Sequence, residues 1–134
     1  MIFLKNLICR MEKHPKTIWS ITAMYALLIF YLSSIPLTQP PPVVEIPFID
    51  VIEHIVEYAI LGGLLLISFR SIKRDAVFAV ILLVFLYGFS DEVHQLFTPG
   101  RFFDIWDIAA DFAGGIIGVF VVKKETGWRH KNEY

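Results

Sequence analysis

Four long apolar segments fill most of this 134-residue chain, and this feature limits the possible folds more than any other. They cover residues 17–34, 50–69, 75–97 and 102–122, and each is close to the ~20 residues that a helix needs to cross ~30 Å of hydrocarbon. Because lipid offers no hydrogen-bond partners to the backbone, each segment is predicted to be helical. Residues of hydrophobic type make up 56% of the chain, so too little polar sequence remains to cover four such helices in water. The sequence therefore predicts an all-α fold, an integral membrane four-helix bundle with the lipid bilayer as its main partner.

The first apolar segment follows four basic residues, an arrangement that signal peptides also show. No small-residue cleavage signal follows it, and the run Ser33-Ser34-Ile35-Pro36 ends it, so an uncleaved first helix is expected. Residues 1–16, which precede this segment, could hold a short amphipathic helix on the membrane surface. We expect a cytoplasmic N-terminal segment (1–16), a transmembrane domain (17–122) and a cytoplasmic C-terminal tail (123–134).

Basic residues predict the orientation of the bundle. Of the twelve Lys and Arg residues, four lie in 1–16, three in 70–74 and four in 123–134. The loop 35–49 has none, and the third loop has only Arg101. Since cytoplasmic loops carry an excess of Lys and Arg, both termini are predicted to be cytoplasmic in a multi-pass protein of the cell membrane. The basic runs are thus topology signals, and no nucleic-acid partner is expected.

Acidic residues have the opposite bias and gather at the predicted outer ends of the last three spans. At 100° per residue, each of these helices carries a polar face about two turns long. Ionisable groups within a span are costly and usually face a bundle interior or a water-filled cavity. The polar faces comprise Asp50, Glu53, His54 and Glu57; then Asp91, His94 and Gln95, with Glu92 beside them; then Asp104, Asp107 and Asp111. A rise of ~1.5 Å per residue puts Glu57, Asp91 and Asp111 deepest.

So many carboxylates at close range cannot all stay ionised without compensation. Shared protons, Arg101, a cationic ligand or a divalent metal ion could supply it. The spacings His54-x-x-Glu57 and Asp91-x-x-His94 place an imidazole and a carboxylate on one helix face, as metal sites in helical bundles do. This pattern is permissive, so these four residues are candidate metal ligands without a predicted metal identity.

Each polar residue also has a purely structural interpretation. Asp50 and Asp104 lie where helices begin and could be caps. The two histidines could be interhelical hydrogen-bond donors, and Arg101 could form an ion pair with Asp104 or Glu92. Tyr58 could be a core residue.

Several motifs resemble those of the VanZ-like family of small bacterial membrane proteins. The resemblance covers residues 30–120 and is most specific between Asp91 and Arg101. The motifs are Asp50-x-x-x-His54-x-x-x-Tyr58, then Tyr87-Gly88-x-Ser90-Asp91-Glu92-x-His94-Gln95-x-Phe97-x-Pro99-Gly100-Arg101, then Asp104-x-x-Asp107 and the glycines that end at Gly118. The resemblance implies a role at the cell envelope, because some members are linked to resistance against glycopeptide antibiotics of the teicoplanin type.

Two departures from the family pattern change the charge of the site. Val51 stands where the family usually has lysine, and Asp111 stands where it usually has asparagine. One positive partner is lost and one carboxylate is gained, which favours a cation-dependent site.

Three functions fit these observations, and whether the protein is an enzyme stays open. A membrane enzyme could act on a lipid-linked or amphiphilic envelope molecule, an accessory protein could bind one without chemistry, and a transporter could couple to protons or cations. The apolar inner halves of the spans disfavour transport.

Candidate catalytic residues are Glu57, Asp91, Glu92, His94 and Arg101. Candidate binding residues are Asp50, His54, Tyr58, Gln95, Asp104, Asp107 and Asp111. Candidate metal ligands are His54, Glu57, Asp91 and His94.

Overall fold

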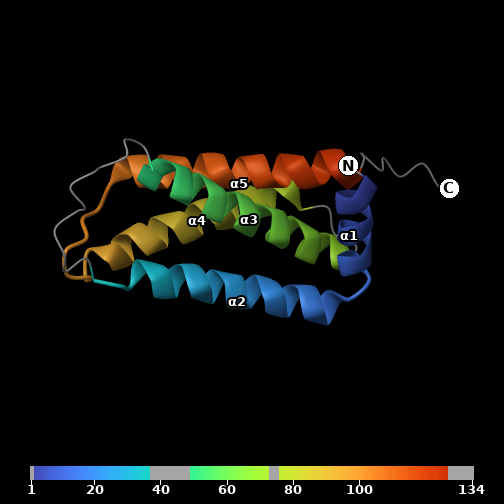
Figure 1. Ribbon diagram of the computed structural model, residues 1–134, viewed down its shortest axis with the longest axis horizontal. Helices are drawn as coiled ribbons and strands as arrows, with labels where there is room; N and C mark the ends of the chain where they lie inside the picture. Colours follow the sequence, from blue (N-terminus) through green and yellow to red (C-terminus); the bar gives the residue numbers. More distant parts are fainter. Residues whose placement is uncertain (1, 37–48, 73–75, 127–134) are drawn as a thin grey trace.

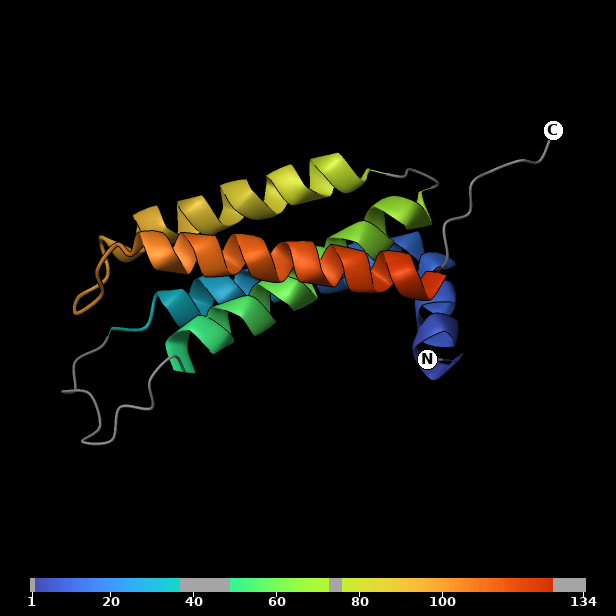
Figure 2. The ribbon, with the colours of Figure 1, turned by 90° about the horizontal axis from the view of Figure 1, so that it is seen from above.

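A computed structural model describes residues 2–36, 49–72 and 76–126 of the chain. Within these residues every regular element is a helix. Four long helices run side by side, and a fifth, short helix lies across one end of them (Figures 1 and 2). The helices are α1 (Ile2–Glu12), α2 (Pro15–Ser33), α3 (Ile49–Ser71), α4 (Val77–Gln95) and α5 (Ile105–Thr126).

The four predicted spans are confirmed, with boundaries that differ by a few residues. Helices α2 to α5 are each long and apolar enough to cross a membrane. Helix α2 begins two residues earlier than expected because Pro15 occupies its first turn, where a proline needs no backbone N–H partner. The chain is therefore an all-helical, multi-pass membrane protein. The proline-rich first loop, residues 73–75 and the last eight residues of the tail lie outside the described residues.

The closest helix packing joins α3 to α5 through glycines. A side chain at Gly114 or Gly118 would run into the backbone carbonyl of Ile55 or Ala59, respectively. Gly115 similarly faces Gly62 across the interface. Small residues allow transmembrane helices to approach until their backbones touch, so this pair forms the rigid centre of the bundle.

Helix α1 was expected only as a possible surface helix, and the structure shows it as a separate element (Figure 1). Ile8 is buried against the bundle, and Glu12 accepts a hydrogen bond of 2.8 Å from Arg70 Nε at the end of α3. In contrast, Phe3 and Leu7 are exposed next to Lys5 and Arg10. This mixture suits a helix that lies in the membrane interface.

The two ends of the bundle differ in chemistry. The end that carries α1 and the C-terminal turn of α5 is here called the basic end (Figure 1). Its half of the bundle is filled by buried apolar residues, including Leu66, Val80 and Val122. The opposite end, where α2 and α4 finish and α3 and α5 begin, is called the acidic end. All of the predicted site residues lie at the acidic end.

Candidate functional site

A histidine and two aspartates connect α3 to α5 at the acidic end. His54 Nδ1 lies 2.8 Å from Asp111 Oδ1, and His54 Nε2 lies 3.7 Å from Asp107 Oδ2. The side chain of Asp111 is 1% exposed, whereas those of His54 and Asp107 are 17% and 21% exposed. When Asp111 is ionised, Nδ1–H donates to it, and Nε2, which lies 3.7 Å from Asp107 Oδ2, takes no part in that bond.

Asp111 is close to a tyrosine and a glycine from two other helices. A side chain at Gly88 would come within 2.8 Å of Asp111 Oδ2 and 3.2 Å of Tyr58 Cε1, so the glycine lets α4 approach both groups. Asp111 Oδ2 and the Tyr58 hydroxyl are buried and form no hydrogen bond with the described residues. Buried polar groups without partners are rare in proteins because they are costly, and they require an explanation.

A second set of polar contacts joins α2 to α4. Ser33 Oγ donates a hydrogen bond of 2.7 Å to Asp91 Oδ1, and Asp91 is 4% exposed. Ser34 Oγ lies 2.9 Å from His94 Nε2, and the imidazole stacks on Phe30 with ring centroids 4.3 Å apart. Since Ser34 Oγ also donates to the Phe30 carbonyl at 2.6 Å, its oxygen accepts from His94 Nε2–H.

Glu92 points to α5 and helps to start that helix. Its Oε2 accepts a hydrogen bond of 2.9 Å from the backbone N–H of Asp104, while its buried Oε1 has no partner among the described residues. Asp104 Oδ1 in turn accepts from the backbone N–H of Trp106 at 2.8 Å. Asp104 is therefore an N-cap of α5, as the structural interpretation expected.

Arg101 lies over the end of α2. Its Nε and Nη2 donate to the carbonyls of Ile35 and Leu32 at 3.3 and 3.2 Å, and within the described part of the chain it forms no ion pair. Contacts to helix-terminal carbonyls, which a guanidinium stabilises, thus stand in place of the ion pair with Asp104 or Glu92 that was one structural interpretation. Gly100, with φ of 80°, turns the chain so that Arg101 reaches back.

The remaining predicted residues differ in depth. Glu57 is half-buried, and its backbone carbonyl accepts a hydrogen bond of 3.2 Å from the Tyr25 hydroxyl. Gln95 is buried, whereas Asp50 is exposed in the first turn of α3.

The candidate metal ligands are divided between the two sets of contacts. His54 faces α5, and Asp91 and His94 face the serines of α2. No group of three or more His, Cys, Asp or Glu side chains in the described residues is arranged to hold a metal ion. A bound cation therefore stays a prediction from the charge of this end.

Ser33 and Ser34 were not predicted as site residues, although they contact Asp91 and His94 directly. The available signal was the Ser33-Ser34-Ile35-Pro36 motif, which marks the end of α2 beside the acidic residues. Helical spacing within one span could not show which helix each polar face meets.

The arrangement around His54 is suited to proton transfer. A carboxylate that holds one imidazole nitrogen fixes the ring and leaves the other nitrogen to accept or donate a proton. Asp111 supplies this orientation, and Asp107 stands beside the free nitrogen.

Comparison with known proteins agrees with the motifs and with the fold. No curated protein and no solved structure matches the chain. A family match covers residues 15–124, which include α2 to α5 except the last two residues of α5 and contain every residue of both contact sets. The chain therefore belongs to the VanZ/LLP1 family.

Proposed function

We propose that this protein binds an amphiphilic or lipid-linked molecule of the cell envelope at its acidic end, and that this end faces the non-cytoplasmic side. The observation that carries the proposal is the contact between the partly buried His54 and the buried Asp111, which joins two membrane spans. Asp111 Oδ2 and the Tyr58 hydroxyl lie buried next to this pair without partners among the described residues. Intramembrane ionisable groups are kept at a cost in stability, which favours a functional role.

His54 is the best candidate to exchange a proton with the bound molecule. Its side chain is 17% exposed, Nε2 is not bound by Asp111, and Asp111 acts as the positioning residue. Asp91 and Glu92 are engaged by Ser33 and by the backbone of Asp104, so they are better suited to shaping the site. Glu57 remains a second acid–base candidate because it is only half-buried.

A binding role without chemistry is the main alternative. An acid–base catalyst should lose ~10²–10⁴-fold in rate when its proton carrier is replaced, whereas a binder would keep its function if shape and hydrogen bonding were preserved. Transport is less well supported. Leu66, Val80, Val84 and Val119 fill the basic half of the bundle, which leaves the polar residues on one side only.

The family resemblance connects the proposal to glycopeptide antibiotics. Teicoplanin-type antibiotics carry an acyl chain and act on lipid-linked cell-wall molecules, so both are amphiphiles of the class proposed here. We therefore propose that the protein changes how such molecules bind or are displayed at the outer leaflet.

Growth of a glycopeptide-sensitive bacterial host in teicoplanin tests this function. Expression of the wild-type chain should raise the inhibitory concentration, and His54→Gln should remove the effect at equal membrane abundance. Glu53→Gln is the matched control, because Glu53 is an exposed carboxylate next to His54 with no contact in either set. An effect that survives in His54→Gln, or its absence in the wild type, would contradict the proposed role.

A further inference from the structure

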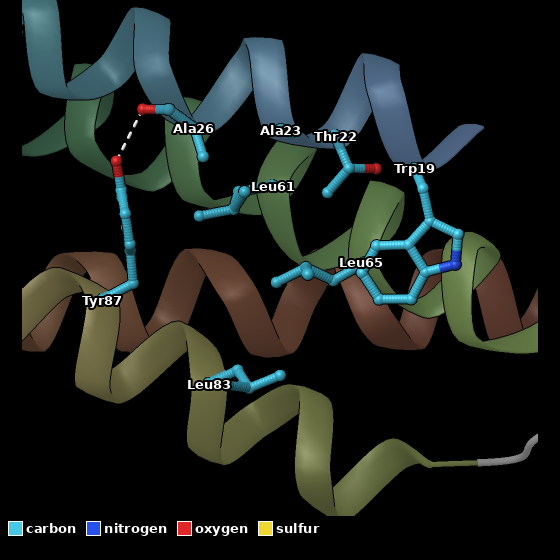
Figure 3. A pocket seen from close by; sticks show the side chains of 8 residues that line it. All are labelled: Trp19, Thr22, Ala23, Ala26, Leu61, Leu65, Leu83 and Tyr87. Atoms are coloured by element: carbon cyan, nitrogen blue, oxygen red, sulfur yellow. Dashed lines mark hydrogen bonds between the residues drawn. The ribbon is translucent and has the colours of Figure 1, made fainter. Parts of the chain in front are cut away.

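A groove opens between α2, α3 and α4 on the basic side of Tyr87 (Figure 3). Its volume is about 220 Å³, and all of its lining residues belong to the three spans. The principal lining residues are Trp19, Ala23, Ala26, Leu61, Leu83 and Tyr87.

The two hydroxyl groups on the groove wall already have hydrogen-bond partners. The Tyr87 hydroxyl donates to the Ala26 carbonyl at 2.6 Å, as Figure 3 shows. Thr22 Oγ1 lies 2.9 Å from the Ile18 carbonyl and 2.8 Å from Ser68 Oγ. Because these hydroxyls have partners, the groove offers an apolar surface. An enclosed apolar cavity of ~150 Å³ stays dry and takes up small apolar molecules, and the apolar wall of this open groove is likewise suited to hydrocarbon.

The surroundings of the groove determine which molecule can enter it. Next to the lining residues, Met24 and Leu27 on α2 and Leu82 and Leu86 on α4 are exposed within the spans. These side chains face bilayer hydrocarbon, so the mouth of the groove opens to acyl chains. From Trp19 to Ala26 the groove follows eight residues of α2, which are ~10 Å from first to last along the helix axis.

The groove ends about one helical turn from the residues of the acidic end. Tyr87 closes it on that side, and the Tyr87 ring lies 6.2 Å from that of Tyr58 between centroids. Asp91, one helical turn beyond Tyr87, is held by Ser33. A molecule whose polar head lies at the acidic end would therefore have its chain at the entrance of the groove.

We infer that the groove binds one acyl chain of a membrane lipid whose head group lies at the acidic end. This inference deepens the proposed function and rests on it for the position of the head group. It identifies the ligand class as an acylated amphiphile and separates recognition of the chain from recognition of the head.

Quenching of Trp19 by phosphatidylcholine with a brominated acyl chain tests the inference. Trp106→Phe and Trp128→Phe leave Trp19 as the only tryptophan, in the full chain purified in detergent. We expect saturable quenching at low lipid-to-detergent ratios. Ala23→Phe, which fills the groove, should remove the saturable part, and Ala113→Phe on the exposed face of α5 should not. Ala26→Leu is a smaller filling change if Ala23→Phe does not fold.

The inferred acyl-chain site would be overturned by quenching that rises linearly with lipid, or by quenching that is equal in Ala23→Phe and wild type. It would also be overturned if Ala113→Phe lost saturable quenching to the same extent as Ala23→Phe. Quenching that disappears as the protein self-associates would also overturn it, because a second copy would then fill the groove. The proposed function can be contradicted independently of the acyl-chain site. If Ala23→Phe removes saturable quenching while His54→Gln keeps the teicoplanin effect, the groove stands and the role of the polar site does not.

Discussion

His54 Nδ1 on α3 lies 2.8 Å from Asp111 Oδ1 on α5, and this contact links the two most closely packed helices at their acidic end. The glycines along the same interface bring the helix backbones together, which places the two side chains within hydrogen-bond distance. The close packing of α3 and α5 thus positions the His54–Asp111 contact. The glycine interface and the polar contact can be tested by separate substitutions.

The His54–Asp111 contact should be visible as an energetic coupling. In a double-mutant cycle with His54→Ala and Asp111→Ala, we expect a coupling of at least ~0.6 kcal/mol, the average for hydrogen bonds between transmembrane helices. Unfolding in detergent measures it. Phe120→Ala, at an exposed position further along α5, should combine with His54→Ala additively to within ~0.5 kcal/mol. Additive behaviour of His54 and Asp111 would show that they do not interact.

Two alanine substitutions in the α3–α5 interface should have opposite effects. At Gly118 the new Cβ would overlap the Ala59 carbonyl, which cannot move without shifting the helix, so the loss should be ~1–3 kcal/mol or more. At Gly63 the new Cβ would lie 3.4 Å from Val122 Cγ2, and Gly63→Ala should be neutral or stabilising by up to ~1 kcal/mol. Thermal unfolding of the two variants compares them. Equal stability would contradict the observed packing.

Two tyrosines near the acidic end should respond differently to loss of the hydroxyl. Tyr87→Phe removes the bond to the Ala26 carbonyl and should cost ~0.5–1.5 kcal/mol. Tyr58→Phe removes a buried hydroxyl without a partner among the described residues, so stability should stay the same or rise. If the hydroxyl of Tyr58 contacts the ligand, Tyr58→Phe should still weaken the teicoplanin effect. A clear loss of stability in Tyr58→Phe would mean that its hydroxyl has a structural partner.

Orientation in the membrane can be measured with single cysteines in a Cys9→Ala background. The basic residues predict that the acidic end is outside. Phe102→Cys, at an exposed position beside the start of α5, should react with a membrane-impermeant thiol reagent on intact cells. Lys13→Cys at the basic end should react only after permeabilisation. The reverse pattern would place the acidic end in the cytoplasm.

The sequence was sufficient to predict the spans and the gathering of the candidate polar residues at one end of the bundle. Runs of apolar residues near the length of a membrane crossing define α2 to α5, and the charged residues outside them define the two ends. The polar faces were also predictable, because helical periodicity determines which residues of one helix lie together.

The partners of those residues were not predictable, because they depend on how the helices are arranged. Neighbouring spacing suggested that His54 acts with Glu57 and that Asp91 acts with His94. In the structure His54 instead meets Asp111 across the glycine interface, while Asp91 and His94 each meet a serine of α2. Arg101 similarly turns to the end of α2 because Gly100 bends the loop in that direction.

Native mass spectrometry of the purified protein tests the central claim most directly. The wild-type chain should retain a stoichiometric amphiphile from the host membrane. Asp111→Ala should remain folded but lose the amphiphile, because alanine cannot accept the hydrogen bond from His54 Nδ1 that orients the imidazole. Glu53→Gln should retain it. Equal retention of the amphiphile in wild type and Asp111→Ala, or none in the wild type, would contradict a binding site built on His54 and Asp111.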